Sequence, residues 1–152
     1  MSFFIELEAA ATVDLDKIQK ICFLGGRLVD YTGADIYLNK NGLRFVNEGA
    51  SHGDVLVELL KQPQRAMWVI TDSQSKKGLS LENKLADGAV KKFDSLRQVA
   101  AFIGCPAETL EETVTRYNDF VLKGVDKDFG KKVMLQTISY PPFYVGQERV
   151  GV

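Results

Sequence analysis

Residues that bind metal ions are scarce in this chain. It contains one histidine, His52, and two cysteines, Cys22 and Cys105, which lie far apart in the sequence and form no C-x-x-C motif. Zinc sites need several such ligands at short spacing, so we expect no metal site of this type. We interpret both cysteines as reduced, largely buried thiols, which is typical of intracellular proteins.

An excess of charge of one sign and long apolar runs are missing as well. Nineteen lysine and arginine residues oppose 20 aspartate and glutamate residues, for a net charge of -1. This balance gives no reason to expect nucleic acid or an anionic membrane as a partner. No apolar run approaches the roughly 20 residues that span a bilayer, and residues 1–6 lack the basic start of a signal peptide. We therefore expect a cytoplasmic protein.

The common nucleotide-binding and hydrolase motifs are also absent from the sequence. No G-x-G-x-x-G stretch follows a predicted strand, and there is neither a P-loop nor a G-x-S-x-G motif. The pair Gly25-Gly26 alone is too weak a signal for a phosphate-binding turn. A mechanism that needs two imidazoles is excluded, because His52 is the only histidine. We expect no cofactor to be bound by this chain.

What is present fits a globular domain. Hydrophobic residues make up 45% of the chain and charged residues 26%, and 152 residues are enough to bury a core. No linker divides the sequence, so we predict one domain over residues 1–152. Strands and helices are mixed without strict βαβ alternation. This pattern predicts an α+β fold, a small mainly antiparallel sheet with a β-hairpin, covered by three to four helices.

The predicted hairpin spans residues 36–46. Two apolar-rich runs are joined by Asn41-Gly42. Both residue types tolerate the positive φ angles of a type I′ turn, so we predict a two-residue connection.

Capping residues, glycines and prolines set the other predicted elements. Ser95 with Gln98 forms a capping box, and Asp54 is the predicted N-cap of an earlier helix. We predict Trp68 in the core and Lys131 in a solvated turn. The predicted elements are helix 54–61, central strand 66–71, helix 80–87, strand 89–93, helices 95–103 and 106–123, and an extended stretch 143–145.

A polar turn before the first of these helices is the candidate site. Residues 44–54 place carboxylate, amide, hydroxyl and imidazole groups beside a helix N-terminus, which favours anions. Two interpretations stay open from the residues alone. The turn either meets a carboxylate-bearing substrate and moves a proton, or it is a solvated loop in which Asp54 caps the helix and His52 has no catalytic role.

Several stretches, in order along the chain, together resemble one enzyme family. Residues 33–48 are similar to a G-x-x-x-V-N-x-x-G-x-R-F-x-N-E motif, residues 94–104 to D-S-L-x-x-V-A-x-x-I-G, and residues 124–130 to G-x-D-x-D-F-G. These motifs, and a closing P-F-Y strand, are typical of the capping domain of FAD-dependent fumarate reductases and the related urocanate and acrylate reductases. The resemblance covers residues 30–150 and leaves residues 1–29 as an N-terminal extension.

The resemblance implies a cap that closes over an unsaturated carboxylate and excludes water. In the family, reduced FAD in another domain passes hydride to the substrate, and an arginine of the cap protonates it. His52 lies where that arginine is found, so we expect it to deliver the proton. Glu48 and Asp54 are then neighbouring relay or positioning groups. The candidates for substrate binding are Asn47, Ser51 and Asp30, the last in place of a carboxylate of the family's proton relay.

Two functions remain open at this point. The chain is either a cap that needs a separate FAD-binding domain or chain and is inactive alone, or a free-standing ligand-binding or protein-interaction module derived from such a cap. An enzyme with an unfamiliar site of its own is disfavoured by the missing nucleophile–base pairs. A cap without its flavin domain is expected to expose an apolar face and to self-associate.

Overall fold

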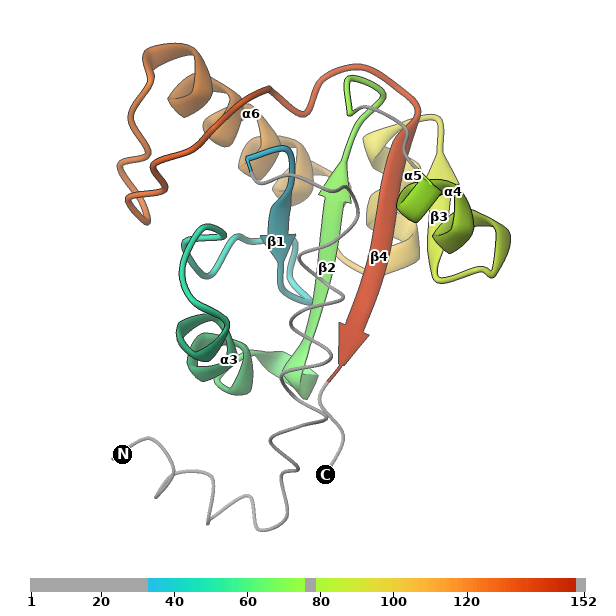
Figure 1. Cartoon of the computed structure of the whole chain (residues 1–152), viewed down its shortest axis with the longest axis horizontal. Coiled ribbons are helices and arrows are strands. Elements are labelled where there is room, and N and C mark those ends of the chain that lie inside the picture. The colour runs from blue at the N-terminus through green and yellow to red at the C-terminus, as the bar shows by residue number, and fades with distance from the viewer. Residues whose placement is uncertain (1–32, 76–78, 150–152) are drawn as a thin grey trace, which may run out of the picture.

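The elements follow the predicted order closely. The structure, a computed structural model, describes residues 33–75 and 79–149 (Figure 1). Within these residues the chain forms β1 (Ile36–Leu38), α3 (His52–Leu60), the 3₁₀ helix η1 (Pro63–Arg65), β2 (Ala66–Thr71), α4 (Leu79–Ala86), β3 (Val90–Phe93), α5 (Leu96–Ile103), α6 (Ala107–Lys123) and β4 (Phe143–Arg149). The predicted α+β class is confirmed.

The described strands form one antiparallel sheet in the order β1-β2-β4-β3. β2 is buried along its whole length, as its continuous apolar run predicts, and it pairs with β1 on one side and β4 on the other. β4, the last strand in sequence, therefore lies inside the sheet, between β2 and β3 (Figure 1).

Both faces of the sheet are covered by helices. Side chains alternate along each strand, so each face contributes to its own core cluster. One face packs against residues of α3 and α4, and its strand residues are Tyr37, Met67, Val69, Val90 and Tyr144. The other face packs against α5 and α6, and its strand residues are Ile36, Leu38, Ala66, Trp68, Ile70, Phe143 and Val145. The prediction that Trp68 is buried is confirmed.

The predicted two-residue turn at Asn41-Gly42 is wrong. The chain does reverse there, but Leu38 and Arg44 form a single antiparallel bridge around a wider loop, residues 39–43. The Asn39 side-chain Oδ1 accepts hydrogen bonds from the backbone N–H groups of Asn41 and Leu43, at 2.9 and 3.1 Å. An Asx-type turn therefore replaces the type I′ turn.

The helix ends are mostly as predicted, with one correction. Ser95 caps α5, and Gly104 and Gly124 end α5 and α6 in the left-handed conformation. The predicted N-cap at Asp54 is wrong, because α3 begins at His52 and its cap is Ser51, whose Oγ accepts from the Asp54 N–H at 3.2 Å. The helix thus starts earlier than its apolar stripe indicates.

Some predictions lie outside the described residues. The N-terminal extension, residues 1–29, is among them, as are Cys22 and Asp30. Cys105 is half-buried, and burial raises the pKa of its thiol. Within the described ranges, no helix has the length and apolar character needed to cross a membrane.

Candidate functional site

The predicted turn presents most of its candidate residues to the surface. Ser51, His52 and Asp54 are exposed in the first turn of α3 and at its cap. Asn47 is half-buried, and its Oδ1 accepts from the Gly49 N–H at 2.8 Å, which closes a compact Asx turn. These side chains lie where an incoming molecule could reach them.

Glu48, in contrast, points into the fold. Its side chain is 1% exposed and forms an ion pair with Arg44, with 2.6 Å between Arg44 Nη2 and Glu48 Oε1. Glu48 Oε2 accepts a second hydrogen bond from Arg44 Nε, at 2.8 Å, and a third from the Tyr37 backbone N–H, at 3.1 Å. These bonds fasten the base of the turn to β1.

Arg44 also binds the loop that follows α6. Its Nη1 and Nη2 donate to the two oxygens of Asp126, at 3.2 and 2.9 Å, and the Asp126 side chain is fully buried. Burial alone raises the pKa of Asp126, but hydrogen bonds from Arg44 and from the Lys131 backbone N–H outweigh it and hold the value at about 2. Arg44 is thus a buried cation between two carboxylates.

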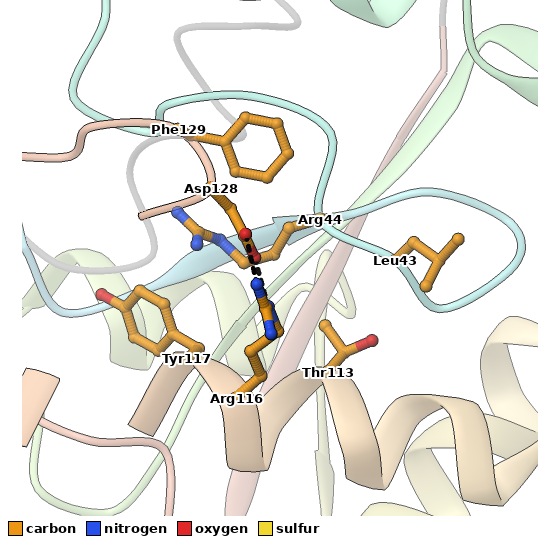
Figure 2. A pocket seen from close by; sticks show the side chains of 7 residues that line it. All are labelled: Leu43, Arg44, Thr113, Arg116, Tyr117, Asp128 and Phe129. Carbon is orange, nitrogen blue, oxygen red and sulfur yellow. Dashed lines mark hydrogen bonds and ion pairs between the residues drawn. The ribbon is translucent and has the colours of Figure 1, made fainter. Parts of the chain in front are cut away.

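A pocket of about 270 Å³ opens beside Arg44, between the loop after β1, α6 and the loop that follows α6 (Figure 2). The Arg44 guanidinium stacks on the rings of Tyr117 and Phe129, at 4.7 and 5.0 Å from their centroids. Arg116, at the same pocket, binds Asp128 with both Nε and Nη2, at 2.6 and 2.7 Å. Both guanidinium groups therefore already hold carboxylates of the protein itself.

The prediction that Lys131 lies in a solvated turn is wrong. Its side chain is 2% exposed, and Nζ donates to the Asp35 backbone oxygen at 2.6 Å and to the Tyr117 hydroxyl at 2.9 Å. The same ammonium lies 3.7 Å from Glu48 Oε1. Lys131 therefore joins the cluster around Arg44, which we call the buried charge cluster: Asp35, Arg44, Glu48, Tyr117, Asp126 and Lys131.

Sequence reasoning missed most of this cluster. Arg44 and Glu48 lie four residues apart, but the rule that opposite charges at this spacing pair applies within helices, and these two residues lie outside any helix. Asp126 and Lys131 lie about 80 residues further along, and nothing local marks them as buried. No group of three or more histidine, cysteine, aspartate or glutamate residues in the described part of the chain is arranged to hold a metal ion.

Comparison with known proteins identifies the class of protein. The chain belongs to the FAD binding domain family, whose match covers residues 24–151. Among curated proteins it is 30% identical over 118 residues to a fumarate reductase (cytochrome) of Shewanella frigidimarina. The aligned region covers 77% of this chain and 21% of that protein. It is also 30% identical over 123 residues to the NADH:acrylate oxidoreductase of Vibrio harveyi, covering 77% of this chain and 12% of that protein.

Solved structures agree with these relatives. The fold matches the open conformation of a flavocytochrome c3 fumarate reductase with a TM-score of 0.67 and 25% identity, over 88% of this chain and 22% of that chain. The resemblance to the fumarate reductases is thus confirmed. The chain spans only 21% and 12% of the length of these two curated relatives.

The described residues do not fit the pyrophosphate of a dinucleotide cofactor. Dinucleotide-binding units hold that group at a glycine-rich turn between a parallel strand and a helix. All strand pairs described here are antiparallel, and no G-x-G-x-x-G sequence follows any of these strands.

Proposed function

We propose that this chain is the substrate-capping part of a flavin-dependent reductase of unsaturated carboxylates, and that FAD is held outside it. The observation that carries the proposal is the likeness to the open fumarate reductase, which covers 88% of this chain but 22% of that enzyme. The antiparallel sheet supports it, because such a sheet suits a lid better than a dinucleotide site.

In this proposal His52 is the proton donor. It is exposed at the first turn of α3, and an imidazole can give up a proton near neutral pH. Ser51 and Asn47 lie on the same short segment and are proposed to bind the substrate carboxylate, with Asp30 contributing from outside the described residues. Asp54, exposed two residues after His52, is proposed as the neighbouring relay group.

Glu48 is better suited to positioning than to relay. It accepts hydrogen bonds from Arg44 and from the Tyr37 N–H, and its side chain is 1% exposed. A carboxylate held in this way fixes the start of the turn relative to the sheet. The proton donor is then presented from a rigid base, as efficient proton transfer requires.

A flavin-binding domain or chain is the proposed partner, and it completes the site. Alone, the chain is proposed to bind no FAD and to turn over no substrate. We further propose that it is one domain and that it works in the cytoplasm. A small unsaturated carboxylate is the proposed substrate.

A second candidate is a free-standing interaction module. Several large apolar side chains are exposed near the end of α6 and in the segment after it, which favours contact with another protein. They are Leu122, Val125, Val133, Leu135 and Tyr140.

Two measurements test the leading proposal. First, FAD is titrated calorimetrically into the 152-residue protein. We expect no binding, and micromolar affinity would contradict the proposal. Second, residues 33–149 replace the matching segment of the Shewanella frigidimarina fumarate reductase, and fumarate reduction is assayed in the purified chimera.

A variant of the chimera at His52 tests whether this residue donates the proton during fumarate reduction. Loss of a general acid typically costs a factor of about 100 or more, so the His52→Gln chimera is expected to lose at least that much of kcat. The control is Glu82→Gln, which changes an exposed side chain on α4 and should leave the rate unchanged. A chimera that keeps its FAD but reduces no fumarate would favour the interaction module, whereas an active chimera indifferent to His52→Gln would refute the role of His52 as proton donor.

A further inference from the structure

Lys131 contacts several acceptors in the buried charge cluster. They include the Tyr117 hydroxyl, at 2.9 Å, and Glu48 Oε1, at 3.7 Å. The backbone oxygen of Asp35 also accepts from Lys131 Nζ, at 2.6 Å. An ammonium group has three N–H donors, and these two hydrogen bonds use two of them. A third N–H is left for another acceptor.

One oxygen of the nearby Asp35 carboxyl lacks a hydrogen bond. Asp35 is 6% exposed, and its Oδ2 is buried without any hydrogen bond. An ionised carboxylate in that position costs free energy unless a cation pairs with it. The ammonium that already holds the backbone oxygen of the same residue is the natural partner.

Charge balance explains why the pair is not made in this arrangement. Two cations, Arg44 and Lys131, face two carboxylates, Glu48 and Asp126. Within these residues an ionised Asp35 is a third carboxylate facing two cations, and Lys84 of α4 offsets only part of its charge. Burial raises the pKa of Asp35 to about 7; Lys131 opposes this rise and Glu48 adds to it.

We propose that Asp35 and Lys131 form a proton-dependent clasp. When Asp35 carries a proton, Lys131 donates to Tyr117 and lies beside Glu48, as the structure shows. When Asp35 loses its proton, the Lys131 ammonium moves toward the new carboxylate and donates its third N–H to it, so the hydrogen bond to the Tyr117 hydroxyl lengthens. The segment after α6 then binds the start of β1 through both the backbone and the side chain of Asp35.

Charged groups on other elements also act on the pair. Lys84 of α4 is a further cation acting on Asp35, and it favours the ionised form. Arg44 and Asp126 act on Lys131 with opposite signs. Since burial lowers the pKa of Lys131 while Glu48 and Asp35 raise it, ionisation of Asp35 also strengthens the positive charge that it needs.

The test is a pH titration of the 152-residue protein by NMR, from pH 5 to 9, and it needs neither flavin nor substrate. The side-chain carboxyl carbon of Asp35 is expected to titrate with a midpoint near 7. The Lys131 Nζ and Tyr117 Cζ resonances should change with the same midpoint. In the Asp35→Asn variant both should stay constant over this range.

A matched pair of variants sharpens the test. Lys131→Met removes the cation, so the Asp35 midpoint should rise by about one pH unit or more. Lys132→Met changes the exposed neighbour and should leave the midpoint in place. The clasp is refuted if Lys131 and Tyr117 do not respond while Asp35 titrates, if they respond equally in Asp35→Asn, or if Asp35 does not titrate at all. The wild-type and Asp35→Asn titrations decide the question even if Lys131→Met fails to fold.

Discussion

Removal of the Arg44 guanidinium tests how far the buried charge cluster supports the fold. The change Arg44→Met keeps an apolar stem of similar length between Tyr117 and Phe129 but removes the guanidinium that pairs with two carboxylates. Those carboxylates belong to Glu48 and Asp126, with side chains 1% and 0% exposed. Breaking a buried ion pair from one side typically costs about 3–5 kcal/mol. This is a large part of the total stability of an ordinary domain.

The expected signal is a lower urea midpoint. With a slope of about 2 kcal/mol per molar urea, a loss of about 4 kcal/mol lowers the midpoint by about 2 M. The single tryptophan, Trp68, is 3% exposed and reports unfolding through its fluorescence. Unfolding of Arg44→Met is therefore compared with that of the wild type at pH 7.

Arg116→Met is the matched control. Arg116 also binds an aspartate of the loop after α6, but its side chain is 62% exposed, and solvent screens such pairs. We expect its urea midpoint to stay within experimental scatter. The reasoning is refuted if Arg44→Met lowers the midpoint no more than Arg116→Met does. A triple variant that adds Glu48→Gln and Asp126→Asn should recover part of the loss, because it removes the stranded charges.

Two further changes have defined outcomes. The pKa of Asp126 is held at about 2, below its ordinary 3.8, so its stabilisation is complete above pH 4 and is lost as the pH falls through 2. That shift corresponds to about 2 kcal/mol, so the stability gap between wild type and Asp126→Asn should narrow by about that amount between pH 5 and pH 2, as measured by urea unfolding; a constant gap contradicts it. Gly42→Ala should destabilise more than Gly124→Ala, since both glycines have positive φ but an added Cβ at Gly42 would lie 2.9 Å from Cys105 Sγ, whereas Gly124 has open space. Thermal unfolding should show the excess disappearing in a Cys105→Ala background, and equal losses would refute the packing argument.

The sequence predicted the helices and strands well, because helix caps and buried strands depend on residues that are close together in the chain. The capping box at Ser95 and the helix-ending glycine at Gly104 are visible in sequence because caps are satisfied within a few residues. The strand 66–71 was predicted because a buried central strand needs an apolar residue at each position. Resemblance to a family then supplied the expected arrangement of these elements, which periodicity alone does not give.

The wrong predictions concern residues whose conformation or burial depends on contacts with segments distant in the sequence. Asn41-Gly42 is a strong hairpin signal, but the loop takes a wider form, with Gly42 against Cys105 from the α5–α6 connection. Lys131 was assigned to solvent because lysines usually are exposed, and its acceptors on Asp35 and Tyr117 lie 96 and 14 residues away. The candidate residues of the turn were located by the structure, and their roles in catalysis stay predictions.

The strand order has a consequence for how the chain reaches this fold. β4 pairs with β2 on one side and β3 on the other, so its seven residues, Phe143–Arg149, join two halves of the sheet. Until those residues leave the ribosome, the apolar β2 has an open edge, and open apolar edges recruit other strands. Synthesis from β2 onward therefore passes through a stage exposed to aggregation, and a nascent chain stopped before residue 143 should bind chaperones that a completed one escapes.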